Sequence, residues 1–592
     1  MIKRIRENII WIVVITSILL NIIATRYELA GHNLVDHPYL GILLYPFSNV
    51  RYGYYVARKL ALSVIAFLVS GYWLSRQKGV VAAIQKNKKY LIAIGMVLLF
   101  SRILTYGFWF YNDDTRFFNY HLYAPTLPNY NPQSVWGPFG FHPIAILLLV
   151  IRWFGTNYTL YNTLGLVFYF FAGVLIFVFL NKVQKNKFVS FLAAIFFLTT
   201  PTYFQGRLLI GEIINSPYIL ILIVISFYFL FQKFLPGSLI FAAAALDYGV
   251  AKSYFIAIPL TLFAIFVVKL KPKSKLFLYI VTLFLMSYVY KPAFFGAPGG
   301  PGTLSELLNQ DALIVYGDVL QSVILPHGIA FPLIQLFNLI FNGWIYINTV
   351  LGFSLIASFF VMGVVAYRKK KHVTFYIILI GLSIIIPTAA LGSLKGVRVD
   401  RNVEKLVEYF IHSQTPTGAT GYGFFPALGL TFIFVALASL LKRKGFKIFA
   451  FSIIFINLIT SMAYDYKWLN SPYSLPQRKY DSQLKNVLHR DGIGKYVYVP
   501  SKQRPLFQGV ETFVNIFQGD QTYYLSMDSD EFVAFLEKDK PSSEQIYYFI
   551  TSGKPDYKIY DYSNKIRNIP YDELAPIIQS LNKELVPDPT YF

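Results

Sequence analysis

Apolar stretches that approach or exceed the roughly 20 residues needed to cross the hydrocarbon core of a bilayer recur along the first 464 residues of this chain. Hydrophobic residues make up 55% of the 592-residue sequence and charged residues only 14%, which is too apolar for a water-soluble protein of this length. The sequence therefore predicts an α-helical polytopic membrane protein with about 13 transmembrane helices. The predicted spans are residues 9–25, 58–74, 90–110, 158–180, 188–204, 213–231, 238–250, 253–268, 276–290, 344–367, 373–391, 424–441 and 448–464.

The net charge of +23 comes from short loops between these spans. From Asp465 onward the chain has 15 Lys or Arg against 17 Asp or Glu, whereas the preceding part has 38 against 13. Basic residues in short loops follow the positive-inside rule, and they do not indicate a nucleic-acid partner. The predicted protein is a multi-pass protein of the plasma (inner) membrane, with a retained N-terminal anchor, a cytoplasmic N-terminus and an extracytoplasmic C-terminal segment.

We expect two domains. The membrane domain comprises residues 1–464, and its external loops are residues 111–157, 292–343 and 393–423. Within the first loop, "FHPIAILLLVIRWFG" (141–155) has only 15 residues, a proline near its start and a charged Arg152. These features favour an interfacial or re-entrant helix on the outer surface over a full span.

Residues 465–592 predict a small extracytoplasmic α/β domain. Its composition is more polar, and its hydrophobic residues follow the periods of strands and amphipathic helices. We expect strands at "KYVYVP" (495–500) and "PDYKIYDYS" (555–563). We expect capped helices at "DSDEFVAFLEKD" (528–539), "SSEQIYYFI" (542–550) and "YDELAPIIQSLNKEL" (571–585).

The first outer loop carries two adjacent acids, Asp113 and Asp114, where an apolar helix ends. An ionised acid beside lipid is costly unless it faces water, a partner or a substrate. Adjacent helical residues point about 100° apart, so one of the pair can face a cavity and act as a general base on an acceptor hydroxyl. The alternative is a hydrated helix end with an ion pair to Arg116. His142, at the far end of the loop, is predicted to contact substrate and not to bind metal.

Two further outer positions place charge at predicted helix mouths. Glu212 lies at the start of the sixth span with Arg207 five residues before it, and Asp247 lies at the outer end of the seventh span with Lys252 opening the eighth. Ionisable residues at membrane depth are candidate functional residues. Asp247 and Lys252 could equally form a structural ion pair, or Lys252 could hold a lipid phosphate.

The loop at 393–423 is the only strongly basic loop on the predicted outer side, since it contains Lys395, Arg398 and Arg401. Arginines bind phosphate in a bidentate manner, so these residues are predicted to contact a polyprenyl phosphate or pyrophosphate. The alternative is a solvated amphipathic helix over residues 397–411.

Other chemistries find no support in the sequence. The chain has no cysteine, which excludes disulfides, thiolate catalysis and Cys-ligated metals. It contains no Walker loop, no HExxH motif and no protein-kinase signature. No cofactor is predicted with certainty, and the sequence leaves open whether a divalent cation, Mg²⁺ or Mn²⁺, assists.

With these residues in place, the layout resembles that of the GT-C glycosyltransferases over about residues 90–290. The likeness consists of an apolar span ending in acids, a long aromatic external loop continued by "GPFGFHPIAILLLVIRWFG", the outward-starting span "GEIINSPYILILIVISFYFLFQKF" and the segment "AALDYGVAKSYFIAIPLTLFAIF". Two spans precede this unit, whereas many members begin with the acid-bearing helix. The "WWDYG" signature of oligosaccharyltransferases is absent, because "ALDYG" lacks the tryptophans, so the resemblance is to monosaccharide transferases of the mannosyltransferase or aminoarabinose-transferase kind.

The resemblance implies a polyprenyl-phosphate-linked sugar as donor, transfer at the outer membrane face to a glycan, lipid or protein acceptor, and contact with membrane lipids. It places the general base at Asp113 or Asp114. It also implies that Glu212 shapes the site and that Lys252 with Arg398 or Arg401 neutralises the departing lipid phosphate.

Two other classes of function remain open at this point. One is a transporter or flippase for lipid-linked saccharides, although such proteins usually show repeats and midplane charges that are not visible in this sequence. The other is a non-catalytic GT-C-like scaffold that presents the C-terminal domain to other envelope proteins. Twelve of the 13 acids before Asp465 lie on the predicted outer side, which favours chemistry at that face.

Overall fold

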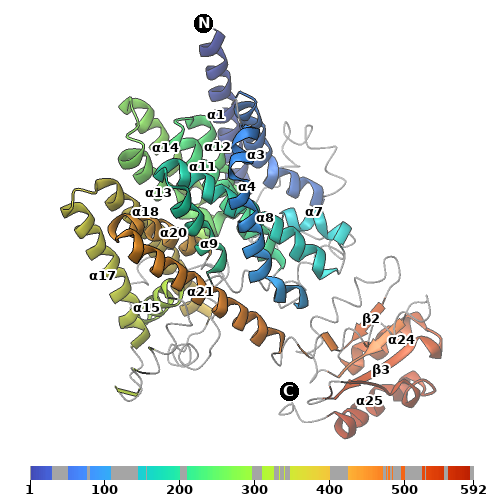
Figure 1. Cartoon of the computed structure of the whole chain (residues 1–592). Helices are drawn as coiled ribbons and strands as arrows, with labels where there is room; N and C mark the ends of the chain where they lie inside the picture. The colour runs from blue at the N-terminus through green and yellow to red at the C-terminus, as the bar shows by residue number, and fades with distance from the viewer. Residues whose placement is uncertain are drawn as a thin grey trace. The chain divides into compact units, whose positions relative to one another are not determined.

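A computed structural model shows a predominantly helical chain with a small β-sheet near its C-terminus (Figure 1). The structure describes residues 2–29, 51–76, 80–108, 145–154, 157–200, 210–295, 310–325, 347–399, 424–470, 495–500, 523–526, 528–552 and 558–586, with single positions at 333, 336, 339, 340, 475, 478, 479, 483 and 556. The chain divides into two compact units. We call them the helical unit (Met1–Ile103, Pro128–Leu149 and Tyr161–Tyr464) and the C-terminal unit (Leu104–Leu127, Val150–Leu160 and Asp465–Phe592).

Helices or short helical turns occur at every predicted span. They are α1 (Ile2–Leu29), α3 (Arg51–Leu74), α4 (Val80–Ser101), α7 (Ala145–Phe154), α8 (Tyr158–Gln184), α9 (Lys187–Thr199), α11 (Ile210–Phe231), α12 (Leu235–Ser253), α13 (Ala257–Leu262), α14 (Lys273–Phe295), α15 (Gln310–Ile324), α17 (Ile347–Arg368), α18 (His372–Val399), α20 (Phe424–Leu440) and α21 (Arg443–Leu469).

Six of the described helices are long and apolar enough to cross a membrane, judged by length and composition. They contain the stretches Asn8–Arg26, Tyr158–Gln184, Ile213–Phe231, Thr349–Arg368, His372–Ala390 and Arg443–Tyr466. Shorter apolar helices follow at Leu60–Leu74, Lys187–Thr199, Ala257–Val267 and Phe425–Leu440. The chain is thus a membrane-embedded helical protein, and the full number of spans stays a prediction.

Two predicted spans differ from the sequence prediction. The span predicted at 253–268 is a run of short pieces: a 3-10 turn (η5, Tyr254–Ile256), α13, and a π-helical turn (η6, Phe263–Val267) closed by a bond of 3.0 Å from Val268 N to Phe263 O. The span predicted at 90–110 starts earlier, at Val80, so the basic "QKNKK" stretch is helical and not a loop. That helix also ends earlier, at Ser101, before the 3-10 helix η2 (Ile103–Gly107).

The predicted external loop at 292–343 contains α15, an element that sequence reasoning missed. This helix packs closely on α17, because a Cβ added to Gly352 would lie 2.0 Å from the carbonyl oxygen of Gly317. Gly381 and Gly429 allow a similar approach of α18 to α20, with added Cβ atoms 2.7 and 2.6 Å from the opposite carbonyl oxygen. Such glycine contacts are typical of helix interfaces in membranes, where close backbone packing stabilises association.

Within the C-terminal unit, four strands form a sheet in the order β2-β1-β3-β4. The strands are β1 (Lys495–Tyr498), β2 (Tyr523–Ser526), β3 (Ile546–Thr551) and β4 (Ile559–Asp561). β1 pairs in parallel with β2 and β3, and β4 is antiparallel to β3. The helices α24 (Ser529–Asp539) and α25 (Tyr571–Leu585) match predicted helices and contribute Phe532, Leu536, Leu574 and Ile578 to its hydrophobic core.

The helix predicted at 542–550 is wrong. The capping box between Ser542 and Gln545 exists, but it closes only a 3-10 turn (η10, Ser543–Gln545), after which the chain enters β3. All six residues of β3 are buried. A strand covered on both faces has a continuous apolar run and not an alternating one, so the strand period that would have identified it is absent.

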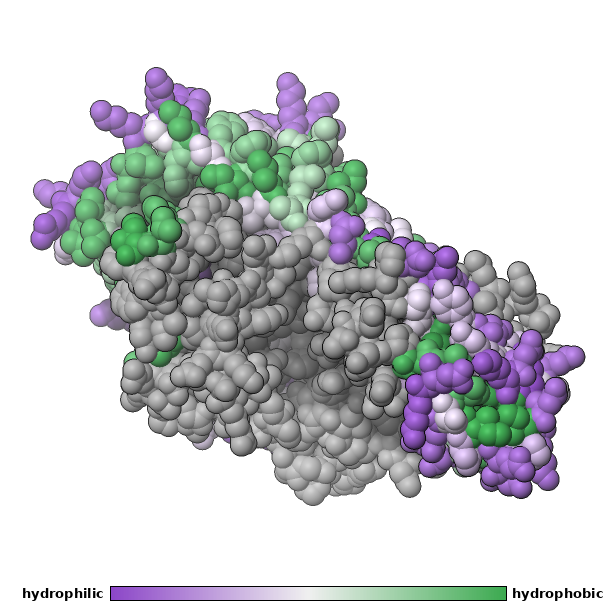
Figure 2. Space-filling model, turned by 90° about the horizontal axis from the view of Figure 1, so that it is seen from below, coloured by the Kyte–Doolittle hydropathy of each residue, from purple (hydrophilic) through white to green (hydrophobic). Residues whose placement is uncertain are grey.

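Asn582 links α25 to the sheet. Its side-chain amide donates to the Tyr498 hydroxyl and its side-chain oxygen accepts from the Tyr548 hydroxyl, both at 2.7 Å. Burial raises the pKa of both tyrosine hydroxyls. In Figure 2 the described surface of the C-terminal unit, at the right, is mainly hydrophilic, whereas that of the helical unit is mainly hydrophobic with hydrophilic side chains at its margin. This contrast is expected for a lipid-facing bundle and a water-facing unit.

Candidate functional site

The tyrosine Tyr248, in α12, connects three helices of the helical unit. Its hydroxyl donates to the side-chain oxygen of Asn215 in α11 at 2.5 Å and accepts from the backbone N–H of Ile146 in α7 at 3.2 Å. The ring also packs edge-on against Tyr218, with centroids 4.8 Å apart. α7 lies in the later part of the predicted external loop at 111–157, so this hydroxyl joins that part of the chain to the start of α11 and the end of α12.

Glycines permit this close arrangement. A Cβ at Gly249 would lie 2.8 Å from the side chain of Ile219, so α12 approaches α11 where it bends, at φ −106° and ψ 21°. A Cβ at Gly165 of α8 would lie only 1.9 Å from Ile213. The backbones of α12 and α8 therefore lie close to the side chains of α11 near Tyr248.

The acid Asp247 is fully buried next to this tyrosine. It lies two residues before the bend of α12 at Gly249, near the end of the predicted span at 238–250. A buried carboxylate at such a depth acts on its immediate neighbours and is shielded from bulk water. Its predicted ion pair with Lys252 is outside the described side chains.

Two other predicted residues lie in described helices at this place. Glu212 is the third residue of α11, three residues before Asn215, so its Cα lies on the same face of the helix one turn earlier. Lys252 lies in the last turn of α12, five residues after Asp247. The structure thus brings the backbone positions of Glu212, Asp247 and Lys252 to the helices that meet at Tyr248.

The remaining predicted residues fall into two groups. Lys395 and Arg398 belong to α18, which continues to Val399, so they lie in its last two turns and not in a loop. Their side chains are not described. Asp113, Asp114, Arg116, His142, Arg207 and Arg401 lie outside the described residues.

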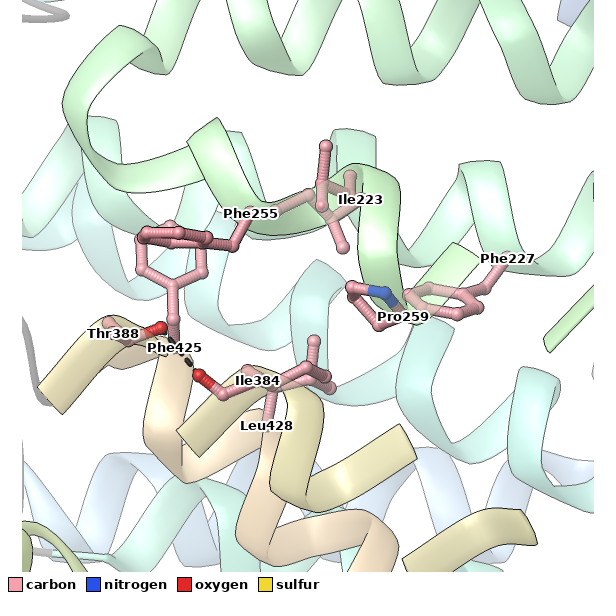
Figure 3. Close-up of a pocket in the computed structure, with 9 residues that line it drawn as sticks. Ile223, Phe227, Phe255, Pro259, Ile384, Thr388, Phe425 and Leu428 are labelled. Carbon is pink, nitrogen blue, oxygen red and sulfur yellow. Dashed lines mark hydrogen bonds between the residues drawn. The ribbon is translucent and has the colours of Figure 1, made fainter. Parts of the chain in front are cut away.

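A small apolar pocket of about 30 Å³ lies where α11, α13, α18 and α20 meet (Figure 3). Phe255, Pro259, Ile384 and Phe425 are among its lining residues. Its one polar side chain, Thr388, already donates to the Ile384 carbonyl oxygen at 2.6 Å. The pocket has room for a small group only, because roughly 10–15 Å³ of such cavity volume is enough for one water molecule. It forms where the helical run at 253–268 breaks, which is why periodicity did not predict it.

Within the C-terminal unit, Arg478 forms hydrogen bonds to the backbone shortly before the predicted external loop at 111–157. Its guanidinium donates to the carbonyl oxygens of Gly107 at 3.3 Å and Leu469 at 2.5 Å. Burial lowers the pKa of this guanidinium, which still stays charged at neutral pH. Gly107 precedes Asp113 by six residues. Sequence reasoning missed this arginine, because its partners lie 371 and nine residues away along the chain.

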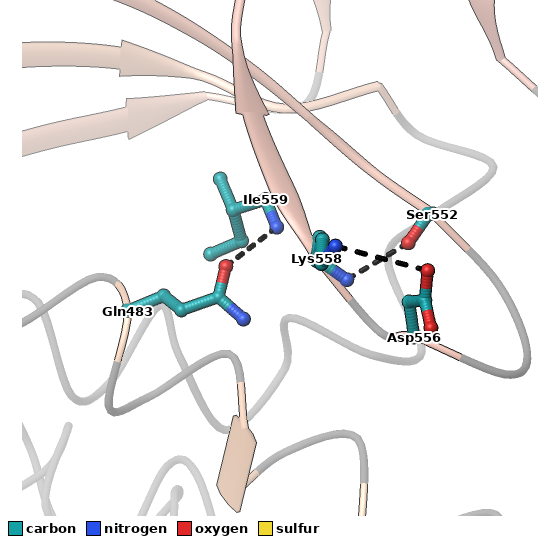
Figure 4. Close-up of polar contacts among 5 residues, drawn as sticks. All are labelled: Gln483, Ser552, Asp556, Lys558 and Ile559. Atoms are coloured by element: carbon teal, nitrogen blue, oxygen red, sulfur yellow. Dashed lines mark hydrogen bonds and ion pairs between the residues drawn. The ribbon is translucent and has the colours of Figure 1, made fainter.

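The segment that carries Arg478 is also bound to the sheet. The side-chain oxygen of Gln483 accepts from the backbone N–H of Ile559 in β4 at 2.8 Å (Figure 4). Next to it, Ser552 Oγ accepts from the Lys558 N–H at 2.8 Å, and Lys558 lies 3.8 Å from Asp556. The connection after α21 is thus fixed to the edge strand at one end and to the backbone of η2 at the other.

Among the side chains that the structure describes, no group of three or more His, Asp or Glu could hold a metal ion. Compared with known families and with characterised proteins, the sequence matches no family model and no individual protein. The function must therefore be argued from the residues and their arrangement.

Proposed function

We propose that the protein is an integral-membrane glycosyltransferase that moves a sugar from a polyprenyl-phosphate carrier to an acceptor at the outer membrane face. In this proposal the N-terminus is cytoplasmic, the protein is in the plasma membrane, and the C-terminal unit lies outside the cell. The resemblance of its layout to GT-C enzymes motivates the reaction class.

The single observation that supports this proposal best is the hydrogen-bonding of Tyr248. One hydroxyl links α7, α11 and α12, which are the elements that carry or follow the predicted acids and cations. A transferase needs such residues from distant segments within reach of one substrate. If the charges at these helix ends did not serve a common site, α7 would not need to be bound to α12 through a fully buried tyrosine.

In the proposed reaction, Asp113 or Asp114 accepts the proton of the acceptor hydroxyl as its oxygen attacks the anomeric carbon of the donor. The bond from that carbon to the phosphate oxygen breaks, and the lipid phosphate leaves with the bonding electrons. Lys252 with Arg398 or Arg401 stabilises the leaving negative charge. General-base catalysis contributes about 10²- to 10⁴-fold, and electrostatic stabilisation of the leaving group the larger share.

The apolar pocket does not itself accommodate a polyprenyl chain, because about 30 Å³ admits only a small group. It lies close in sequence to both predicted phosphate contacts, since Phe255 follows Lys252 by three residues and Thr388 precedes Lys395 by seven. The lipid carrier in this proposal is therefore supported by the resemblance and by the predicted cations, and not by this pocket.

The test is transfer of labelled mannose or aminoarabinose from its polyprenyl-phosphate donor by the full chain in proteoliposomes. Asp113→Asn combined with Asp114→Asn should abolish transfer and leave the thermal unfolding midpoint unchanged. Asp556→Asn, at an exposed acid of the C-terminal unit, serves as the matched control and should retain activity. Movement of intact donor across the bilayer without release of polyprenyl phosphate would favour the flippase alternative, and full activity of the double variant would refute the assignment of the base.

A further inference from the structure

Three turns of the helical unit are strongly basic. Residues 269–275, which run from the end of η6 into α14, residues 368–371, which run from the end of α17 to α18, and residues 442–447, which run from the end of α20 into α21, contain twelve Lys or Arg and no Asp or Glu. We call these three turns the basic rim. All of its cationic side chains are exposed except the half-buried Lys447. Within the described part of the chain, none of them forms an ion pair.

Direct contacts hold the three turns beside one another. Phe266 of η6 stacks on Tyr376 in the first turns of α18, with centroids 4.5 Å apart and planes 14° apart. Lys371 donates through its ammonium group to the carbonyl oxygen of Ser439, near the end of α20. The basic rim is therefore one surface and not three separate loops.

The backbone shows that the charge is kept at a conformational cost. Lys269 has φ 49° and Lys370 has φ 56°, in the left-handed region where helix ends usually have glycine. Lys185 and Lys233, at the ends of α8 and α11, adopt the same conformation. Every non-glycine residue with positive φ in the described helical unit is thus a lysine, and Lys540 at the end of α24 adopts the same conformation. A lysine at a helix C-terminus also interacts favourably with the helix dipole.

The candidate spans place the basic rim at the level of lipid headgroups. The apolar stretches end or begin within it, at Arg368 and Arg443, or directly after it, at His372. Exposed apolar residues such as Val364, Val365 and Ile448 lie directly beside the cations, as expected for side chains that face acyl chains. Clusters of Lys and Arg next to a span attract anionic lipid surfaces.

We propose that the basic rim is a binding site for the phosphate headgroups of anionic phospholipids. Setting the orientation of spans needs only a modest excess of basic residues in short loops. A contiguous surface of twelve cations without one acid exceeds that need, and it is complementary to several phosphates at once.

The unmodified full chain in detergent provides the first test. Phosphatidylglycerol should raise the thermal unfolding midpoint and remain bound in native mass spectrometry, whereas phosphatidylcholine should do neither. The effect should weaken at 1 M salt, where the Debye length falls to about 3 Å. Equal stabilisation by phosphatidylcholine would overturn the proposal. Equal stabilisation by inorganic pyrophosphate would overturn it as well, because the ligand would then be a soluble phosphate.

Variants locate the site. Lys273→Gln, Lys369→Gln and Lys444→Gln together remove one exposed cation from each turn and should weaken phosphatidylglycerol binding by roughly tenfold to 100-fold. The matched control is Lys538→Gln, Lys565→Gln and Lys583→Gln, which removes the same charge from the C-terminal unit and should change binding less than about twofold. Lys→Arg at the three rim positions keeps the charge that orients the spans and should preserve binding. Loss of binding in the control or in the Arg variant would overturn the assignment.

Discussion

Replacing Tyr248 with phenylalanine removes the hydroxyl that joins α7 to α12 and keeps the aromatic ring. The hydroxyl makes two hydrogen bonds, to the side chain of Asn215 and from the N–H of Ile146, and both Tyr248 and Asn215 are almost completely buried. Each polar group left without a partner costs about 1–3 kcal/mol in a protein interior, while interhelical bonds in membranes average about 0.6 kcal/mol. For two bonds we expect a loss of roughly 1–3 kcal/mol in the free energy of unfolding.

The matched control is Tyr279→Phe. Tyr279 in α14 is also fully buried, and its hydroxyl bonds to Ser238 Oγ in α12 at 2.8 Å, away from α7. Thermal unfolding of both variants in detergent and transfer of the labelled sugar in proteoliposomes are measured together. We expect both variants to be less stable and only Tyr248→Phe to lose transfer, by about tenfold or more, because 1.4 kcal/mol of lost positioning corresponds to that factor. Equal activity in the two variants would refute the role given to the Tyr248 hydroxyl.

Four further outcomes are expected from the structure. Gly352→Ala should cost at least about 2 kcal/mol, because its Cβ would overlap the Gly317 carbonyl oxygen, whereas Gly445→Ala, with open space around it, should be neutral when both are compared by thermal unfolding. Arg478→Lys keeps the charge but loses the paired hydrogen bonds, so we expect a fall in kcat of roughly tenfold with little change in KM, measured in the transfer assay. Asn582→Ala should cost about 1–3 kcal/mol, seen as faster hydrogen exchange of β3, since two buried tyrosine hydroxyls lose a partner. Burial raises the pKa of these two tyrosines, so their contribution to the stability of the C-terminal unit is fully present below pH 10, the pKa of an unfolded tyrosine. This contribution is lost as the pH rises from 10 through the higher pKa values of the folded state. Hydrogen exchange across roughly pH 9–11 tests this, and protection unchanged over that range would contradict it.

Much of the helical unit could be predicted from the sequence because apolar stretches of membrane length need no partner to be identified. The helices α24 and α25 were found from their polar caps and periodic apolar faces, as the N-cap Asp528 illustrates by accepting from the N–H groups of Asp530 and Glu531 at 2.9 and 3.0 Å. These signals are local, so a single sequence contains them.

The parts that failed depend on contacts between distant residues. The buried strand β3 was assigned to a helix because its capping box is a local signal, whereas its pairing with β1 is not. The hydrogen bond between Tyr248 and Asn215 joins residues 33 apart, and that between Tyr248 and Ile146 joins residues 102 apart. Neither bond has a sequence pattern, although the "ALDYG" stretch that contains Tyr248 was already singled out for its acid.

The hydrogen bonds of Tyr248 and Arg478 have a common consequence for the first outer loop. Arg478 binds the carbonyl oxygen of Gly107, four residues before the predicted external loop at 111–157, and Tyr248 binds the N–H of Ile146 in the later part of that segment. A general base must lie within hydrogen-bonding distance of the proton it accepts, and the entropy of a long loop opposes such placement. Each bond is made within one unit, the bond of Arg478 within the C-terminal unit and the bond of Tyr248 within the helical unit. Each one reduces the number of conformations that the chain segment it holds can adopt. The proposed function therefore gives Tyr248 and Arg478 a positioning role, through the backbone of the segments that they bind, and no contact with the substrate.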